Sequence, residues 1–146
     1  MGYRFGFFAL ILMTLFGASA RTQDGGQPDG IWLTQAGDAK VRVSQCGGGI
    51  CGVIVWLKEP IDPETGKPAI DDKNPNPALA KRPMIGLPLF RGMRPSGPNK
   101  WSGQIYNADD GKSYAGSVAV IGADTLRVEG CVGALCGGET WTRAKR

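Results

Sequence analysis

Short apolar runs alternate with turn residues along the chain from Gly30 onward. The runs recur about every 8 to 12 residues, which is typical of β-sandwiches and β-barrels. After residue 20, no stretch keeps a helical period of apolar residues for as long as about ten residues. The pattern predicts an all-β chain of eight strands, at residues 30–35, 39–46, 51–58, 84–92, 99–107, 112–121, 124–131 and 136–143.

The alternation within the strands predicts which faces are buried. Residues 40–44 and 125–129 alternate polar and apolar side chains, so we expect these strands to have one face toward solvent and one toward a core. Residues 53–57, Val-Ile-Val-Trp-Leu, are apolar throughout. This run predicts that both faces of the third strand are covered.

Residues 59–83 interrupt the strand pattern. The segment holds six prolines, and proline cannot donate to a sheet ladder, so a long surface loop is predicted. Asp71, Asp72, Asn74 and Asn76 offer oxygen atoms of the kind that bind calcium. They lack the downstream Glu and the Gly of an EF-hand loop, and we therefore expect them to cap turns.

The N-terminus has the order of a secretory signal peptide: Arg4, an apolar run at residues 5–16, and Ala18-Ser19-Ala20. Cleavage is expected after Ala20. Residues 21–29 would then form a flexible lead-in, and residues 30–146 a single barrel domain without a membrane span. A periplasmic or secreted protein is predicted.

The composition excludes several kinds of chemistry. The chain has 17 basic and 13 acidic residues, a net charge of +4 that falls to +3 once Arg4 is removed, and its charges form no basic run. Nucleic-acid binding is therefore not expected. Histidine is absent, which removes Ser-His, Cys-His and His-metal sites. The carboxylates left for an enzyme, Asp71, Asp72, Asp109 and Asp110, all lie in predicted turns, so we assign no catalytic residue and no cofactor.

Four cysteines form two matched pairs, Cys46 with Cys51 and Cys131 with Cys136, each around a four-residue loop between predicted strands. Loop entropy favours a long cross-link, at about 4.6 kcal/mol against about 2.2 kcal/mol for a local one. In an up-and-down arrangement, however, the two pairs lie at opposite ends of the sheet, provided that residues 59–83 contain no strand. We therefore predict two local disulfides. A four-Cys zinc site is disfavoured because export oxidises the thiols, and no metal is predicted.

Seven short motifs, in their order and spacing, resemble a family of exported bacterial proteins of unknown function, DUF2147. The motifs are Gly30-Ile31-Trp32, Cys51 to Leu57, Asp72 to Pro75, Ile85-Gly86-Leu87, Trp101 to Tyr106, Gly111 to Tyr114, and Gly130-Cys131 through Trp141-Thr142-Arg143. The resemblance covers nearly all of the chain after residue 29. It implies a lipocalin-like or calycin-like antiparallel up-and-down barrel with one long proline-rich loop, and it brings no established activity or catalytic residues.

The resemblance also implies a role for the two ends of the chain. In lipocalin-like barrels, the indole of a Gly-x-Trp motif on the first strand is covered by an Arg from the end of the chain. Trp32 and Arg143 would have these roles here. A guanidinium stacked on the indole would close the barrel with a contact of about 1 to 2 kcal/mol.

Two functions fit this barrel. One is a binding module for a small apolar or amphiphilic ligand, with Gly86, Gly103 and Gly116 marking either room for the ligand or barrel bends. The aromatic candidates for its lining, each of which also fits a core, are Trp56, Phe90, Trp101, Tyr106 and Tyr114. The other is a structural or interaction module that contacts an envelope protein through an edge or the proline-rich loop. An apolar cavity of about 300 Å³ or more would favour the ligand, and strands that separate near the loop would favour the partner.

Overall fold

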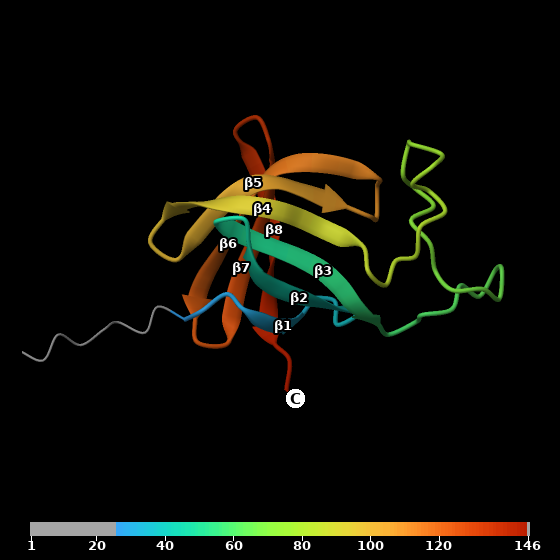
Figure 1. Cartoon of the computed structure of the whole chain (residues 1–146), viewed down its shortest axis with the longest axis horizontal. Coiled ribbons are helices and arrows are strands. Elements are labelled where there is room, and N and C mark those ends of the chain that lie inside the picture. Colours follow the sequence, from blue (N-terminus) through green and yellow to red (C-terminus); the bar gives the residue numbers. More distant parts are fainter. Residues whose placement is uncertain (1–25, 146) are drawn as a thin grey trace, which may run out of the picture.

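The computed structural model describes residues 26–145, in which eight antiparallel strands close into one barrel (Figure 1). The strands are β1 Gly30–Leu33, β2 Ala39–Cys46, β3 Gly49–Leu57, β4 Pro88–Gly97, β5 Lys100–Asn107, β6 Lys112–Gly122, β7 Thr125–Val132 and β8 Leu135–Arg143. Consecutive strands are neighbours, and β8 pairs with β1. The predicted all-β, up-and-down barrel is confirmed. The expected signal peptide lies outside the described residues, which contain no helix that could cross a membrane.

The alternating strands face the core as predicted. Val41 and Val43 of β2 are buried, whereas Arg42 between them is exposed. On β7, Leu126 and Val128 are buried in the same way. These side chains belong to one apolar cluster inside the barrel, so a two-residue period along each strand separates the core from solvent.

A bulge in β3 changes which of its side chains face inward. Val41 pairs with Ile54, but the next pair joins Lys40 to Trp56 and skips Val55. The extra residue shifts the phase of the strand, so Ile54 and Leu57 line the interior and Trp56 lies outside. Trp56 is 38% exposed, and the prediction of cover on both faces of this strand is wrong for its side chain.

The fourth strand lies later in the chain than predicted, at 88–97 rather than 84–92. Gly86 has a left-handed φ of 98° and donates its N–H to the Ile54 carbonyl, which ends the preceding loop against β3. The strand continues through Pro95, which has no N–H to give. This is tolerated because the register with β5 shifts between Pro95 and Gly97.

Both predicted disulfides are present, Cys46–Cys51 and Cys131–Cys136, and they staple the β2–β3 and β7–β8 hairpins. These hairpins are at opposite ends of the barrel. Cys131 and Cys136 are direct cross-strand partners, whereas Cys51 pairs in register with Ser44, so the first bond runs diagonally across its hairpin.

Trp32 and Arg143 meet at one end of the barrel, here called the closed end. The Arg143 guanidinium carbon lies 4.2 Å from the centre of the Trp32 ring, and the indole N–H donates to the Pro28 carbonyl at 2.8 Å. Arg143 also donates to the carbonyls of Asp29 and Gln27, and so holds the chain before β1 across the barrel end.

The glycine of the Gly-x-Trp motif is needed at this end. Gly30 has a φ of 141°, and a Cβ atom there would lie 2.6 Å from Nη1 of Arg143. Glycine therefore makes room for the guanidinium that covers Trp32.

Substitution of Arg143 tests this closure. We expect Arg143→Ala to lower the free energy of unfolding by about 2 to 4 kcal/mol, because it removes the cation–π contact and several charged hydrogen bonds. Arg143→Lys keeps the charge but not the planar fork, and should recover less than half of the loss. Urea unfolding measures both values, and equal stability of the three proteins would contradict the role given to Arg143.

Candidate functional site

The end of the barrel opposite Trp32, here called the open end, contains a cavity of about 810 Å³. The β1–β2, β5–β6 and β7–β8 turns surround its mouth, together with the long loop between β3 and β4. Most of its wall is apolar. The apolar side chains that line it include Val41, Ile54, Leu57, Met84, Leu89, Ile105, Val128 and Trp141.

The barrel is hollow at the open end, where two facing inner positions are glycines. The buried apolar side chains of the strands that do not line the cavity are Trp32, Val43, Ile50, Phe90, Met93, Val118, Val120 and Leu126. Near the mouth, β7 and β8 instead place Gly130 opposite Gly137, and both residues line the cavity. A Cβ atom at Gly137 would have no neighbour within 4 Å. The glycines at positions 130 and 137 therefore leave part of the cavity unfilled.

Two of the five aromatic residues predicted to line a ligand site do line the cavity, namely Tyr106 and Tyr114. The other three lie elsewhere. The β3 bulge turns Trp56 outward, where Lys40 lies over its ring at 4.8 Å. Phe90 fills the core above Gly52, and Trp101 pairs with buried Val118 and packs against that core.

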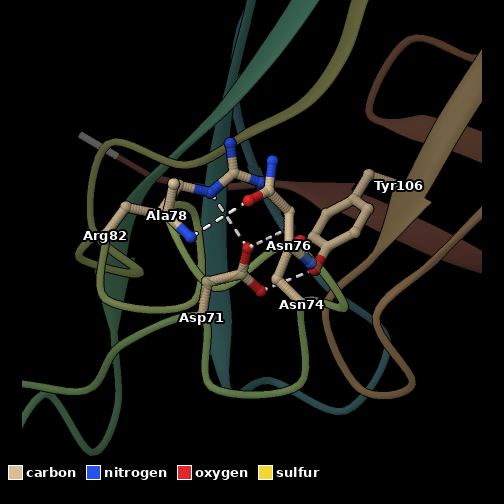
Figure 2. Close-up of polar contacts among 6 residues, drawn as sticks. All are labelled: Asp71, Asn74, Asn76, Ala78, Arg82 and Tyr106. Atoms are coloured by element: carbon tan, nitrogen blue, oxygen red, sulfur yellow. Dashed lines mark hydrogen bonds and ion pairs between the residues drawn. The ribbon is translucent and has the colours of Figure 1, made fainter.

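The loop of residues 58–87, here called the strap, is fixed to the outside of the barrel by a polar network (Figure 2). Asp71 is 1% exposed and accepts hydrogen bonds from the Tyr106 hydroxyl at 2.6 Å, Nδ2 of Asn74 at 3.0 Å and Nε of Arg82 at 2.9 Å. Arg82 also lies over the Tyr106 ring, with its guanidinium carbon 5.4 Å from the ring centre. One buried carboxylate thus joins two parts of the strap to β5.

The side-chain oxygens of Asp71, Asn74 and Asn76 accept hydrogen bonds from other residues of the protein. Asn74 Oδ1 accepts the Asn76 N–H, and Asn76 Oδ1 accepts the Ala78 N–H, so both residues cap turns as predicted. Asp71 was also expected to cap a turn. Its carboxylate instead accepts a hydrogen bond from Tyr106, which is 35 residues away in the chain. Asp72 is exposed. Within residues 26–145, no three acidic or cysteine residues are grouped so that they could hold a metal ion.

The strap also touches the turn between β5 and β6. Gly111 has a φ of 72°, and a Cβ atom there would lie 1.9 Å from the Lys73 carbonyl oxygen. Only glycine allows this approach. Beyond the contact the chain returns to β4 through Met84, which lines the cavity, so the strap forms part of the cavity wall.

Burial raises the pKa of the Tyr106 phenol above its ordinary value, and the hydrogen bond to Asp71 adds to the effect because the carboxylate opposes a second negative charge. Tyr114 at the mouth donates to Asp110. That bond raises the pKa of the Tyr114 phenol and lowers the pKa of the Asp110 carboxyl. Both phenols are therefore neutral donors at physiological pH.

Residues 30–143 match a family model described as an uncharacterized protein conserved in bacteria, DUF2147. The chain belongs to the DUF2147 family. No curated protein matches it.

This DUF2147 protein is also similar to a solved structure described as protein HP1028 from the human pathogen Helicobacter pylori, which belongs to the lipocalin family. The two chains are 24% identical, the match covers 82% of this chain and 84% of the other, and the TM-score is 0.67. At this identity the likeness shows a shared lipocalin-like fold.

Two features of the candidate site of this DUF2147 protein were not predicted from its sequence. No local signal joins Asp71 to Tyr106, because their contact depends on how the strap folds back. The other feature is Glu139, which lies in the cavity wall. Its signal was present, since Glu139 stands two residues before Trp141 on the same strand and so shares its face.

Replacement of Asp71 tests how the strap is held. Asp71→Asn replaces one of the two acceptor oxygens with an NH2 donor and removes the negative charge that is paired with Arg82. We expect a loss of about 2 to 3 kcal/mol in the stability of the strap and faster cleavage of residues 58–87 in limited proteolysis. Asp72→Asn, an exposed neighbour with the same change of charge, is the matched control. Equal cleavage of the two variants would contradict the network.

Alkaline pH tests the Tyr106 phenol. A raised pKa in the folded state means that stability is complete below the unfolded value of about 10 and is lost as the pH rises through the folded value. We therefore expect the free energy of unfolding to fall above about pH 10 in the wild type, and to fall less in Tyr106→Phe. Urea titrations across this range measure the difference; parallel curves would show that Tyr106 does not contribute.

Proposed function

We propose that this DUF2147 protein is a non-enzymatic binding module that holds one small apolar or amphiphilic molecule in the open end of its barrel. The cavity of about 810 Å³ is the observation that supports this most directly. Ligand sites in proteins measure about 300 to 1,000 Å³ and are mostly apolar with a few polar groups. An interior filled by side chains would have favoured a purely structural role.

The mouth of the cavity also supports entry of an apolar ligand. Val132 and Leu135, on either side of the β7–β8 turn, line the cavity and are 68% and 82% exposed. Large apolar side chains at a rim are costly to leave in water unless they contact something. They would meet the apolar part of a ligand as it enters.

Two of the four carboxylates considered for catalysis have structural partners. Asp71 is buried among three donors, and Asp110 accepts from the Tyr114 hydroxyl and the Lys112 N–H. Neither is free to act as an acid or base on a bound molecule without losing these bonds. This supports binding rather than chemistry.

We also propose that the protein works outside the cytoplasm, in the periplasm or after secretion. Two disulfides persist in an oxidising compartment, and the family is bacterial. The N-terminal signal pattern supports the same location.

An envelope interaction module is the second candidate, and one observation favours it. The register pairs of β4 with β5 are confined to residues 94–97 and 100–102, near the closed end, so these strands separate toward the mouth. The strap lies over this opening, and Asn74 and Arg82 line the groove between strap and barrel. A partner would have to bind to the strap or displace it.

Filling the cavity tests the ligand proposal. We expect Gly137→Leu to weaken binding of a neutral naphthylamine dye by about tenfold or more, because the new side chain would occupy the space. Its thermal midpoint should stay close to that of the wild type, since φ at Gly137 is ordinary and no atom lies within 4 Å. Fluorescence titration and thermal unfolding measure the two effects.

Gly97→Leu is the matched control, because Gly97 is exposed on β4 at the closed end and its nearest neighbour would be Cβ of Lys100 at 4.0 Å. This variant should bind the dye as the wild type does. If both variants bind it equally well, the dye is not in the cavity and the proposal loses its support.

A further inference from the structure

Glu139 places a carboxylate on the apolar inner wall of the barrel. It pairs in register with Val128, which is buried, and two residues later Trp141 pairs with buried Leu126. Direct cross-strand partners share a face of the sheet. Glu139 and Trp141 therefore both face the interior, and both line the cavity.

The Glu139 carboxylate accepts one hydrogen bond but forms no ion pair within the described residues. One carboxylate oxygen accepts the Trp141 indole N–H. The ion pairs within residues 26–145 are Arg82–Asp71, Arg127–Glu129 and Arg143–Asp124. The charge of Glu139 is thus oriented by the protein without being neutralised by it.

The other charged residues around the cavity have the same sign. Asp38, Asp109 and Glu129 contribute to the lining, Glu129 in an ion pair with Arg127, whereas no lysine or arginine among the described residues lines the cavity. This contrasts with the net charge of +4 on the whole chain. A cleft with charges of one sign and low-dielectric walls concentrates the field inside it. The cavity is negative within a positively charged protein.

A metal ion does not account for this arrangement. The carboxylates are spread around the mouth, and the described residues contain no group of three that could bind one ion. An organic cation needs only one carboxylate as a partner, and its apolar part would contact the walls formed by residues such as Ile54, Leu57 and Ile105. Trp141 and Tyr114 add aromatic rings, which favour quaternary ammonium groups.

We infer that the cavity selects amphiphiles with a positively charged nitrogen, and that Glu139 binds this nitrogen. The inference rests on the proposed function, since it identifies the ligand class of the same cavity. An anionic amphiphile such as a fatty acid would bring a second negative charge next to Glu139 with no base to compensate it. The wall would therefore reject it on electrostatic grounds.

The test compares amphiphiles that share a twelve-carbon tail. Dodecyltrimethylammonium, dodecyl maltoside and dodecanoate, each below its micellar concentration, compete with the neutral naphthylamine dye for the folded protein. We expect dodecyltrimethylammonium to displace the dye at a concentration about five- to tenfold below that of dodecanoate. This comparison uses the wild-type protein and does not depend on how any variant folds.

Glu139→Gln then assigns the preference to one residue. We expect it to remove most of the difference between the concentrations at which the cation and the anion displace the dye. Glu64→Gln, an exposed residue of the strap, makes the same change of net charge away from the cavity and should keep the full preference.

The outcomes separate the two proposals. If the dye binds and is displaced equally by all three amphiphiles, or if Glu139→Gln and Glu64→Gln behave alike, the inference about charge is wrong and the cavity remains a binding site. If the wild type does not bind the dye, or Gly137→Leu binds it equally well, the proposed function itself fails.

Discussion

The barrel depends on the seam between its first and last strands, which is its shortest ladder. β1 and β8 share two register pairs, Trp32 with Arg143 and Leu33 with Thr142, whereas β7 and β8 share eight. So few main-chain bonds would hold the seam weakly. Arg143 strengthens it by stacking on the Trp32 indole and by donating to three carbonyls on both sides of the closed end. The pair closes the ring that encloses both core and cavity.

The disulfides act within single hairpins, and neither of them links β1 to β8. The contact between Trp32 and Arg143 stabilises that seam. Each links cysteines five residues apart within one hairpin, so each disulfide restricts the unfolded chain less than a long cross-link would. Their position matters more for the site. Cys131–Cys136 joins β7 and β8 at the mouth, directly before Gly137 and Glu139. It fixes the register of the wall that holds both the free space and the unneutralised carboxylate.

Much of this architecture could be predicted because it follows from local patterns. Periodic apolar runs located the eight strands, and two short Cys-x4-Cys segments indicated hairpin disulfides. The features that could not be predicted depend on irregularity or on distant contacts. One unpaired residue, Val55, turns Trp56 from the expected lining to the surface. The contact between Asp71 and Tyr106 forms only after the strap has folded back across the barrel, and a cavity reflects where side chains are small, which a two-residue period does not encode.

The strap lies over the part of the barrel wall that separates the cavity from the groove beneath the strap. Leu89, Tyr106 and Tyr114 line both the cavity and the groove beneath the strap, so the wall there is one side chain thick. This is also where β4 separates from β5, and main-chain pairing cannot hold the wall together. The network around Asp71 replaces that pairing with directional, charged hydrogen bonds, which tolerate less displacement than apolar contacts do. A buried carboxylate on the outside of the barrel thereby keeps a tyrosine in the wall of the cavity inside it.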